Sequence, residues 1–174
     1  MSERYRHILL LSRVVTTTRG RRERQEWNPD LWVLATRLLA SLQDELFERL
    51  VRSGHGDLQP RHGAVLAYLD EDGVRATEVA RLSGAHKQIV GRVVDELESL
   101  GYVERRPDPA DRRAKLIFPT ERGLAAIRLA DEAVAEIEAR HANEIGARTY
   151  SQFRDVLRAV VARRTQFKDV TASA

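Results

Sequence analysis

Four polar side chains lie close together where the sequence predicts the start of a helix, and all of them can donate hydrogen bonds. They follow the turn residues Ser83 and Gly84, and they are His86, Lys87, Gln88 and Arg92. In the major groove of DNA, glutamine can pair bidentately with adenine, and arginine or lysine with guanine. An ordinary helical hairpin with a solvated polar face would carry the same residues. The four side chains therefore suggest base contacts without excluding the simpler interpretation.

A second group of basic side chains lies in a charged stretch with two prolines, DPADRRAKLIFP. Asp111 can hold Arg113 by a charge-assisted hydrogen bond. Arginines that are left free can enter a minor groove, where the negative potential favours them. On its own an arginine-rich loop is usually only a solvated loop, so its interpretation depends on the elements around it.

Other kinds of chemistry find little support in the residue types. The chain has no cysteine, which excludes disulfides, thiolate metal sites and cysteine redox switches. No two histidines stand three or four residues apart on one helix, as a metal-binding pair would. The sequence also has no glycine-rich phosphate loop and no nucleophile in a recognisable elbow. We therefore predict no enzyme activity, no metal and no cofactor, and we expect isolated surface histidines at His7, His55, His62, His86 and His141.

Two helices and a tight turn are predicted to position the four donors. A short helix over about 77–82 breaks at Ser83-Gly84, and a longer one over about 86–100 ends at Gly101, which suits a left-handed cap. This arrangement is a helix-turn-helix. Gly91, inside the longer helix, either lets a phosphate approach closely or is simply tolerated at roughly 1 kcal/mol relative to alanine. The two helices are expected to pack through Ala76, Val79, Ala80, Leu82, Ile89, Val90, Val93 and Leu97.

A β-hairpin is predicted directly after the longer helix. Strand-like runs over 102–106 and 115–118 are joined by a loop over 107–114, whose prolines are expected to stop the strands and limit edge pairing. A hairpin in this place makes a winged helix-turn-helix, and the arginine-rich loop becomes the tip of the wing. The predicted fold class is mainly α.

Long amphipathic helices are predicted on both sides of this unit. Residues 28–30 give a start signal with Asn28 as the cap, and leucines then recur every three to four residues over 31–50. A second helix is expected from Gln59-Pro60 to about 70–73, and two more follow Thr120. Their apolar stripes exceed what a small winged domain can bury. We therefore predict a homodimer that is joined through the long N- and C-terminal helices.

Length and charge point to one compact domain with a basic appendage. The 174 residues carry a net charge of +3, but the first 24 hold seven arginines against two glutamates, so the rest is slightly acidic. No segment reaches membrane-spanning length, and no small-residue cleavage site follows the apolar residues 8–11. We interpret residues 1–27 as a basic arm, disordered or partly helical, on a cytoplasmic protein, with a tail that has no role as the alternative.

The stretch ATEVARLSGAHKQIVGRVVDELESLGYVERRPDPADRRAKLIFPTERG resembles the winged-helix core of the MarR family of bacterial transcriptional regulators. The likeness extends over about residues 28–165. It implies a DNA-binding homodimer, most often a repressor that a small ligand releases. The family pattern of Asp, any residue, Arg, an apolar strand, and then Thr, two residues and Gly matches at Asp111, Arg113, Leu116, Ile117, Thr120 and Gly123.

The resemblance assigns roles to the candidate DNA contacts. Three residues match exposed positions of the recognition helix, one matches the wing arginine, and its neighbour is a second wing candidate. Thr77 stands at a helix start that could bind phosphate. The full set is Thr77, His86, Lys87, Gln88, Arg92, Arg112 and Arg113.

The resemblance also suggests where a small ligand binds. In the family the ligand usually lies between the dimer helices and the winged domain, and here that junction would bring Trp32 near Arg61 and His62. An aromatic ring beside cationic or titratable donors would suit a planar aromatic carboxylate or a phenol. The simpler interpretation is that Trp32 is a core residue and the other two are solvated.

These expectations divide the chain into five segments and name its partners. A basic arm covers 1–27, a first dimerisation helix 28–56, the winged helix-turn-helix 57–120, C-terminal dimerisation helices 121–168 and a tail 169–174. The expected partners are double-stranded DNA, a second copy of the chain and a small aromatic ligand, with no membrane. A winged helix used only for protein interaction is the alternative function, and a wing without basic residues would favour it.

Overall fold

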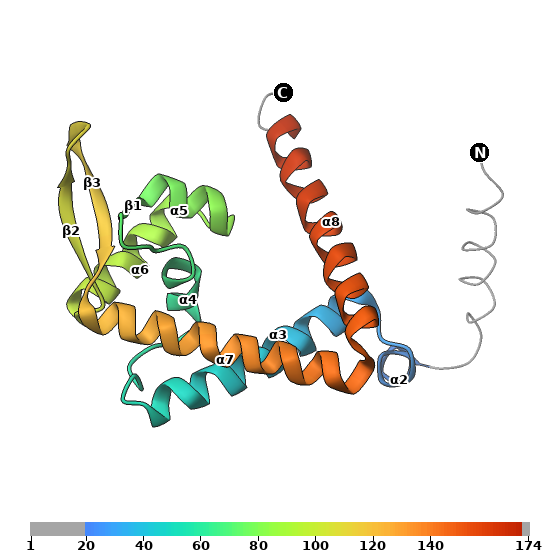
Figure 1. Cartoon of the computed structure of the whole chain (residues 1–174). Coiled ribbons are helices and arrows are strands. Elements are labelled where there is room, and N and C mark those ends of the chain that lie inside the picture. Colours follow the sequence, from blue (N-terminus) through green and yellow to red (C-terminus); the bar gives the residue numbers. More distant parts are fainter. Residues whose placement is uncertain (1–19, 172–174) are drawn as a thin grey trace. The chain divides into compact units, whose positions relative to one another are not determined.

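The computed structural model describes residues 20–171 as helices with one small sheet (Figure 1). Its contacts divide the chain into two units, residues 1–42 and 43–174, which are described separately. Residues 1–19 of the predicted arm and 172–174 of the predicted tail lie outside the described residues. The elements are α2 (Arg21–Trp27), α3 (Leu31–Arg52), α4 (Pro60–Leu66), β1 (Val74–Arg75), α5 (Ala76–Ser83), α6 (Lys87–Ser99), β2 (Val103–Asp108), β3 (Asp111–Pro119), α7 (Glu121–Ile145) and α8 (Ala147–Thr171).

The N-terminal unit consists of α2, which lies at the end of the predicted arm, and the first half of α3. Asp30 caps α3, because its carboxylate accepts the backbone N–H of Val33 at 3.0 Å. Gln25 holds this cap in place: its side-chain amide donates to Asp30 Oδ2 at 2.6 Å and accepts the backbone N–H of Asp30 at 3.1 Å. The prediction that Asn28 caps this helix is therefore wrong, and the acid two residues later has that role.

α4 begins as predicted and ends earlier than predicted. Gln59 precedes it in an extended conformation and Pro60 occupies its first turn. The helix ends at Leu66 and does not extend to residues 70–73. Those residues form a separate tight turn, in which the backbone N–H of Gly73 donates to Asp70 O at 3.3 Å and Gly73 has a φ of +75°. Leu69 lies beyond the helix end but is still buried.

α5 and α6 form the predicted helix-turn-helix. Gly84 ends α5 with a φ of +69°, and Gly101 follows α6 with a φ of +75°, so both glycines adopt the left-handed conformation that favours them. α6 buries Val90, Val93 and Leu97, which recur at the helical period. The prediction is wrong for two side chains, because 43% of Leu82 and 44% of Ile89 are exposed.

The wing is longer and its tip shorter than predicted. The sheet order is β1-β3-β2, all antiparallel, with Val103 opposite Pro119 and Asp108 opposite Asp111. Only residues 109–110 connect β2 and β3. The expectation that prolines stop the strands over 107–114 is wrong, because Pro107 lies in β2 opposite Lys115. β2 is an edge strand, where a missing N–H need not cost a ladder hydrogen bond.

The hydrophobic core of the second unit joins the helix-turn-helix to the wing and the long helices. Its residues come from α3, α4, α5, α6, β2, β3 and α7 and from the segments between them. Its buried members come from several elements, and protein interiors of this kind are close-packed. They are Leu50, Leu58, Val65, Leu69, Val79, Val90, Val93, Val94, Leu97, Tyr102, Val103, Ile117 and Ala126.

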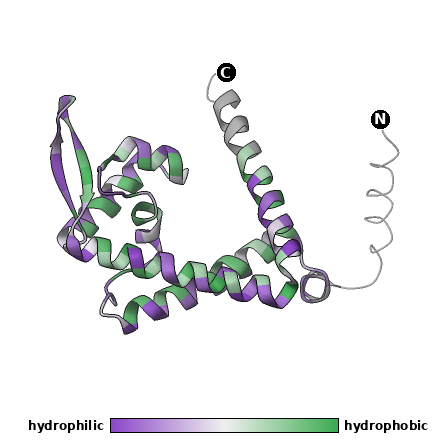
Figure 2. Ribbon diagram, viewed as in Figure 1, coloured by the Kyte–Doolittle hydropathy of each residue, from purple (hydrophilic) through white to green (hydrophobic). Residues whose placement is uncertain are grey.

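The long helices keep part of their apolar surface exposed. In α7, Ile137 is buried, whereas Val134 and Ile145 are about half exposed. Apolar residues recur along α7 and along the described part of α8 (Figure 2). The exposed fraction of the apolar side chains of α8 is 43% for Phe153, 63% for Val156, 45% for Leu157, 53% for Val160 and 60% for Val161. None of the described helices is both long and apolar enough to cross a membrane.

Candidate nucleic-acid interface

One face of α6 presents the predicted hydrogen-bond donors to solvent. His86, the cap residue, and Lys87, Gln88 and Arg92 are all exposed. The opposite face is anchored by the buried valines and Leu97, so the fold fixes the orientation of the donors. Donors on the first two turns of a helix are suited to the major groove, which is wide enough to admit a helix.

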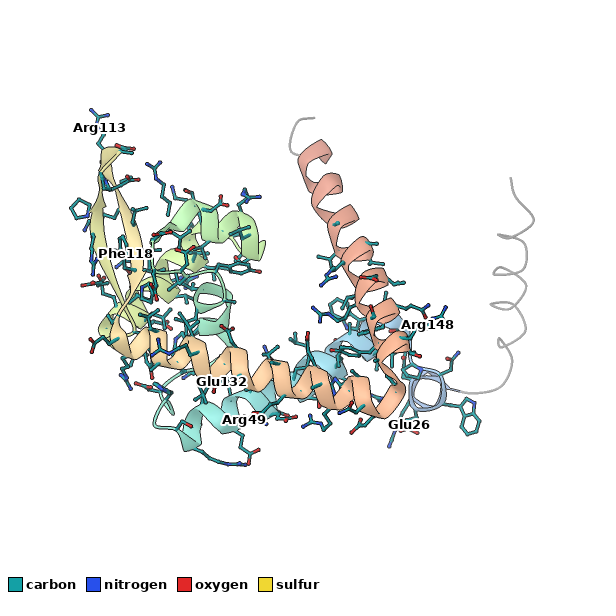
Figure 3. The ribbon with its side chains drawn as sticks, in the orientation of Figure 1. Glu26, Arg49, Arg113, Phe118, Glu132 and Arg148 are labelled. Carbon is teal, nitrogen blue, oxygen red and sulfur yellow. The ribbon has the colours of Figure 1, made fainter. Side chains whose placement is uncertain are left out.

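The tip of the wing carries a second exposed cation. Arg113 extends outward from the tip (Figure 3). Asp111 does not hold its guanidinium as expected; the Asp111 carboxylate accepts the backbone N–H of Arg113 at 3.0 Å, which shapes the turn and leaves the guanidinium exposed. Arg112 is the second residue of β3, and its side chain lies outside the described part of the structure.

Lys115 is a basic residue of the wing that the sequence analysis did not select. It is exposed, and the alternation of side chains along a strand places Arg113, Lys115 and the buried Ile117 on one face of β3. The signal was present in the sequence as a basic residue two positions after the wing arginine. Residues 107–114 were predicted to form a loop, and side chains do not alternate between two faces in a loop. The alternation that places Lys115 on the same face as Arg113 was therefore not apparent.

An ion pair between an exposed arginine and a buried carboxylate connects the wing to the start of α5. Arg75 Nε donates to Asp108 Oδ2 at 2.7 Å, and only 6% of Asp108 is exposed. The other carboxylate oxygen accepts the backbone N–H of Ala110 at 2.8 Å. The Ala110 N–H and then the Arg75 guanidinium hold the pKa of Asp108 below its usual value. Arg75 is thus engaged in positioning the wing, and this role was not predicted.

The remaining arginines near this surface differ in whether they are neutralised by acids. Arg81 pairs with Glu78, Arg105 with Asp95 and Glu98, and Arg106 with Glu104. Among the side chains that the structure describes, no ion pair is formed by the exposed cations Lys87, Arg92, Arg113 and Lys115. The charge of these four side chains is therefore available to an anionic partner.

Thr77 occupies the second position of α5 and is exposed. Arg75, in the cap position, makes no side-chain hydrogen bond to the helix start. The first N–H groups of α5 thus receive no cap from that side chain.

His62 is buried, contrary to the expectation of a surface residue. Its Nδ1 accepts the backbone N–H of Gln59 at 3.1 Å, so the ring proton sits on Nε2, which lies 3.1 Å from Glu96 Oε2 on α6. Arg61 Nε donates to the same oxygen at 2.7 Å. The hydrogen bond from Arg61, and to a smaller extent the one from His62, lowers the pKa of Glu96 below its usual value. Neither ring nitrogen of His62 is left for another partner.

An apolar cavity of about 190 Å³ lies beside His62. Asp131, which is exposed, is its one acidic lining residue, and no lysine or arginine lines it. Arg61 instead lines a neighbouring polar depression, which His62 also borders. Trp32 is 81% exposed and belongs to the N-terminal unit. The cavity is lined by Leu46, Phe47, Leu50, Leu58, His62, Gly63, Leu66, Ala67, Ala126, Ile127, Ala130, Asp131 and Val134.

A second polar cluster, around Tyr102, ties the end of α6 to α7. The Tyr102 hydroxyl donates to Asp57 Oδ1 at 2.6 Å, and Arg122 of α7 lies over the Tyr102 ring and 2.9 Å from Asp57 Oδ2. Burial, and to a smaller extent the hydrogen bond to Asp57, raise the pKa of Tyr102. The same hydrogen bond lowers the pKa of Asp57. His55 Nδ1 lies 3.1 Å from the hydroxyl, so this histidine is not isolated either.

The other histidines have different surroundings. The ring of His141 lies 6.1 Å from that of Tyr150, so it too has an aromatic neighbour. His86 is exposed as expected, and His7 lies outside the described residues. Over residues 20–171, no group of three or more histidines or acids is placed to hold a metal ion.

Comparison with known proteins agrees with this architecture. A protein-family model described as the MarR family matches residues 56–114. A MarR-family transcriptional regulator from Rhodococcus sp. RHA1 is 30% identical, with a TM-score of 0.61, and the match covers 75% of this chain and 93% of that one. CouR from Rhodococcus jostii RHA1, solved with p-coumaroyl-CoA, is 34% identical, with a TM-score of 0.58 and coverage of 75% and 91%.

A third structure supports the fold alone. It is the transcriptional repressor CouR bound to a 23-mer DNA duplex, 22% identical, with a TM-score of 0.65 and coverage of 83% of this chain and 99% of that one. No curated protein sequence matches the chain. The winged helix-turn-helix, the match of the family model and the 30% identity over almost the whole of a solved regulator lead to one conclusion. The chain belongs to the MarR family of transcriptional regulators.

Proposed function

We propose that this chain is a sequence-specific DNA-binding repressor that acts as a homodimer on a pseudopalindromic operator and is released by a small ligand. The observation that carries the proposal is the set of exposed cations without ion pairs, which lie on the first turns of α6 and on the wing. The structure of CouR from Rhodococcus jostii RHA1, which is 34% identical to this chain, contains p-coumaroyl-CoA, and this supports a small ligand.

Each candidate residue has a distinct role in this proposal. Gln88 and Arg92 face the base edges of the major groove, with His86 and Lys87 beside them. Arg113 enters the adjacent minor groove, with Arg112 and Lys115 near the phosphates. Thr77 and the start of α5 contact a phosphate. Because phosphate contacts position the protein and base contacts specify the sequence, α6 carries the specificity.

Two copies of the chain are proposed to meet through their long helices. Monomeric proteins rarely expose large contiguous apolar patches, and such patches mark interaction sites. The N-terminal unit exposes Trp27, Leu31 and Trp32, and the second unit exposes the apolar stripe of α8. Burying these side chains against a second copy would remove them from water and place two α6 helices in a symmetric pair.

Selection of bound duplexes from a random pool tests this function. A two-fold dimer must reach major grooves about one helical turn apart, roughly 34 Å, so the selected site should be a pseudopalindrome with half-sites near 10 base pairs apart. An asymmetric consensus without a repeat would contradict the dimer. If no sequence is enriched and binding is insensitive to salt, the chain functions as a winged helix for protein interaction instead.

Arg113→Ala should weaken binding to the selected site and reduce the slope of log K against log salt by about one unit, because one phosphate-neighbouring charge is lost. Affinities at four or more salt concentrations give the slope. Arg106→Ala is the matched control, since this arginine of the same wing is already paired with Glu104 and stacked on Phe118. An equal loss for both variants would show that only net charge matters.

The cavity beside His62 is proposed as the ligand site. A dry apolar cavity of 150 Å³ can hold benzene, so about 190 Å³ suits one ring or a branched acyl group. A carboxylate inside would meet no cation, because Arg61 lies in the neighbouring depression. The ligand therefore buries a neutral ring and keeps its anionic part outside, near Arg61, as a thioester of an aromatic acid can.

The thermal stability of the protein with and without p-coumaroyl-CoA tests this site. At a ligand concentration 100 times Kd, the free energy of unfolding should rise by about 2.7 kcal/mol, and DNA should be released. Ala130→Leu fills the cavity and should remove both effects, whereas Ala135→Leu on the exposed face of α7 should keep them. Equal responses of the two variants would place the ligand elsewhere. Parallel measurements with p-coumarate and with free CoA show which part of the molecule the protein binds.

A further inference from the structure

Ile89 is an apolar side chain on the polar surface of α6. Although the sequence predicts it as a core residue, 44% of it is exposed, and it does not belong to the hydrophobic core that the described residues form. A single exposed apolar residue is common on protein surfaces and needs no explanation by itself. Its neighbours make this one informative.

Hydrogen-bond donors surround Ile89 along the helix. Lys87 and Gln88 precede it directly, and Arg92 follows three residues later, so Ile89 and Arg92 are neighbours on the helix surface. All three of these polar side chains are exposed. If they face the major groove, Ile89 is desolvated with them when DNA binds.

The major groove offers one apolar group to such a side chain. Base edges there present hydrogen-bond acceptors and donors, with the C5-methyl of thymine as the exception. Isoleucine is also stiff, because its branched Cβ leaves one strongly preferred rotamer in a helix. Its methyl groups are thus held in a fixed place, which is what selection of one base requires.

We propose that Ile89 recognises one thymine in each half-site by packing against its C5-methyl group, an inference that rests on the proposed function. Ile89 then specifies a base pair that the hydrogen-bonding side chains do not. This predicts that the enriched duplexes contain a thymine at a fixed position of each half-site, next to the bases that Gln88 and Arg92 contact.

Deoxyuridine in place of single thymines of the selected site tests the proposal from the DNA side. Deoxyuridine keeps the pairing and the O4 acceptor of thymine and lacks only the methyl group. At the one thymine of each half-site that Ile89 contacts, the substitution should weaken binding by about fourfold when it is made in one half-site and by about 15-fold when it is made in both, the effects expected for one and two buried methyl groups. If no half-site contains a thymine, or if no thymine shows this loss, the proposal is overturned.

The variant Ile89→Ala tests it from the protein side. Because both subunits of the dimer carry the change, the variant should bind the thymine site about as weakly as the wild type binds the duplex with deoxyuridine in both half-sites, and it should no longer distinguish the two duplexes. Leu82→Ala, at an apolar residue of α5 with nearly the same exposure (43%), should keep the wild-type difference. A difference that persists in Ile89→Ala assigns the methyl contact to another residue and overturns the proposal. If the wild type enriches no sequence at all, the proposed function fails instead.

Discussion

Gly123→Ala is expected to lower the free energy of unfolding by about 3 kcal/mol, at the upper end of the usual cost of overpacking. A Cβ at this position would lie 2.0 Å from the carbonyl oxygen of Tyr102 and 3.3 Å from Pro119 Cβ. The first of these atoms belongs to the backbone, which cannot rotate away as a side chain can. Either α7 or the start of β2 must therefore shift.

The close approach at Gly123 results from three hydrogen bonds at Thr120. The Thr120 hydroxyl donates to Gly101 O at 2.7 Å and accepts the Gly123 N–H at 3.1 Å, and the Thr120 N–H donates to Tyr102 O at 3.0 Å. These bonds join the end of α6, the start of β2 and the start of α7. The spacing of Thr, two residues and Gly thus has a physical reason, since the residue three positions after the cap must leave room for the Tyr102 carbonyl.

Gly91→Ala is the matched control for this prediction. A Cβ at Gly91, inside α6, would meet no atom within 4 Å, so alanine should raise the free energy of unfolding by about 0.5–1 kcal/mol through its better helix propensity. Urea denaturation of the three proteins measures both changes. A Gly123→Ala protein that unfolds at the wild-type urea concentration would contradict the packing argument.

The sequence predicted the elements well wherever local signals agree with tertiary packing. The apolar period of α6, the glycine after it and the proline that opens α4 are such signals, and each of these elements is present. The prediction of the wing was wrong for a different reason. Pro107 suggested a loop, but it lies in an edge strand, which accommodates a proline. Local propensity cannot show which strand of a sheet is at the edge, because the order β1-β3-β2 depends on distant residues.

The exposure of the candidate contact residues was predicted more completely than the contacts that position them. Exposed donors follow from helical period alone, so His86, Gln88 and Arg92 could be selected from the sequence. The pairs Arg75–Asp108 and His62–Glu96 join residues more than 30 positions apart, and no local pattern indicates them. Periodicity also placed Ile89 in the core, because an isoleucine beside a buried face looks the same whether or not a neighbouring helix covers it.

Val160→Glu is expected to dissociate the proposed dimer and to weaken binding to the full site by roughly 100-fold or more, because the second half-site no longer binds as an intramolecular partner. Val160 is 53% exposed on the apolar stripe of α8. In a monomer a glutamate there would be solvated and harmless. In an apolar interface it would bury a charge without a partner, which costs far more than the lost methyl groups.

Ser151→Glu separates this effect from the effect of charge alone. Ser151 is exposed on α8, nine residues before Val160, which is about two and a half helical turns and therefore the opposite face. Both variants add one negative charge to the same helix, so general repulsion from DNA should affect them alike. Sedimentation and DNA titration should show a dimer with nearly wild-type affinity for Ser151→Glu and a monomer with weak, half-site binding for Val160→Glu. If Val160→Glu stays dimeric and binds the full site as tightly as Ser151→Glu, the interface does not include the stripe of α8.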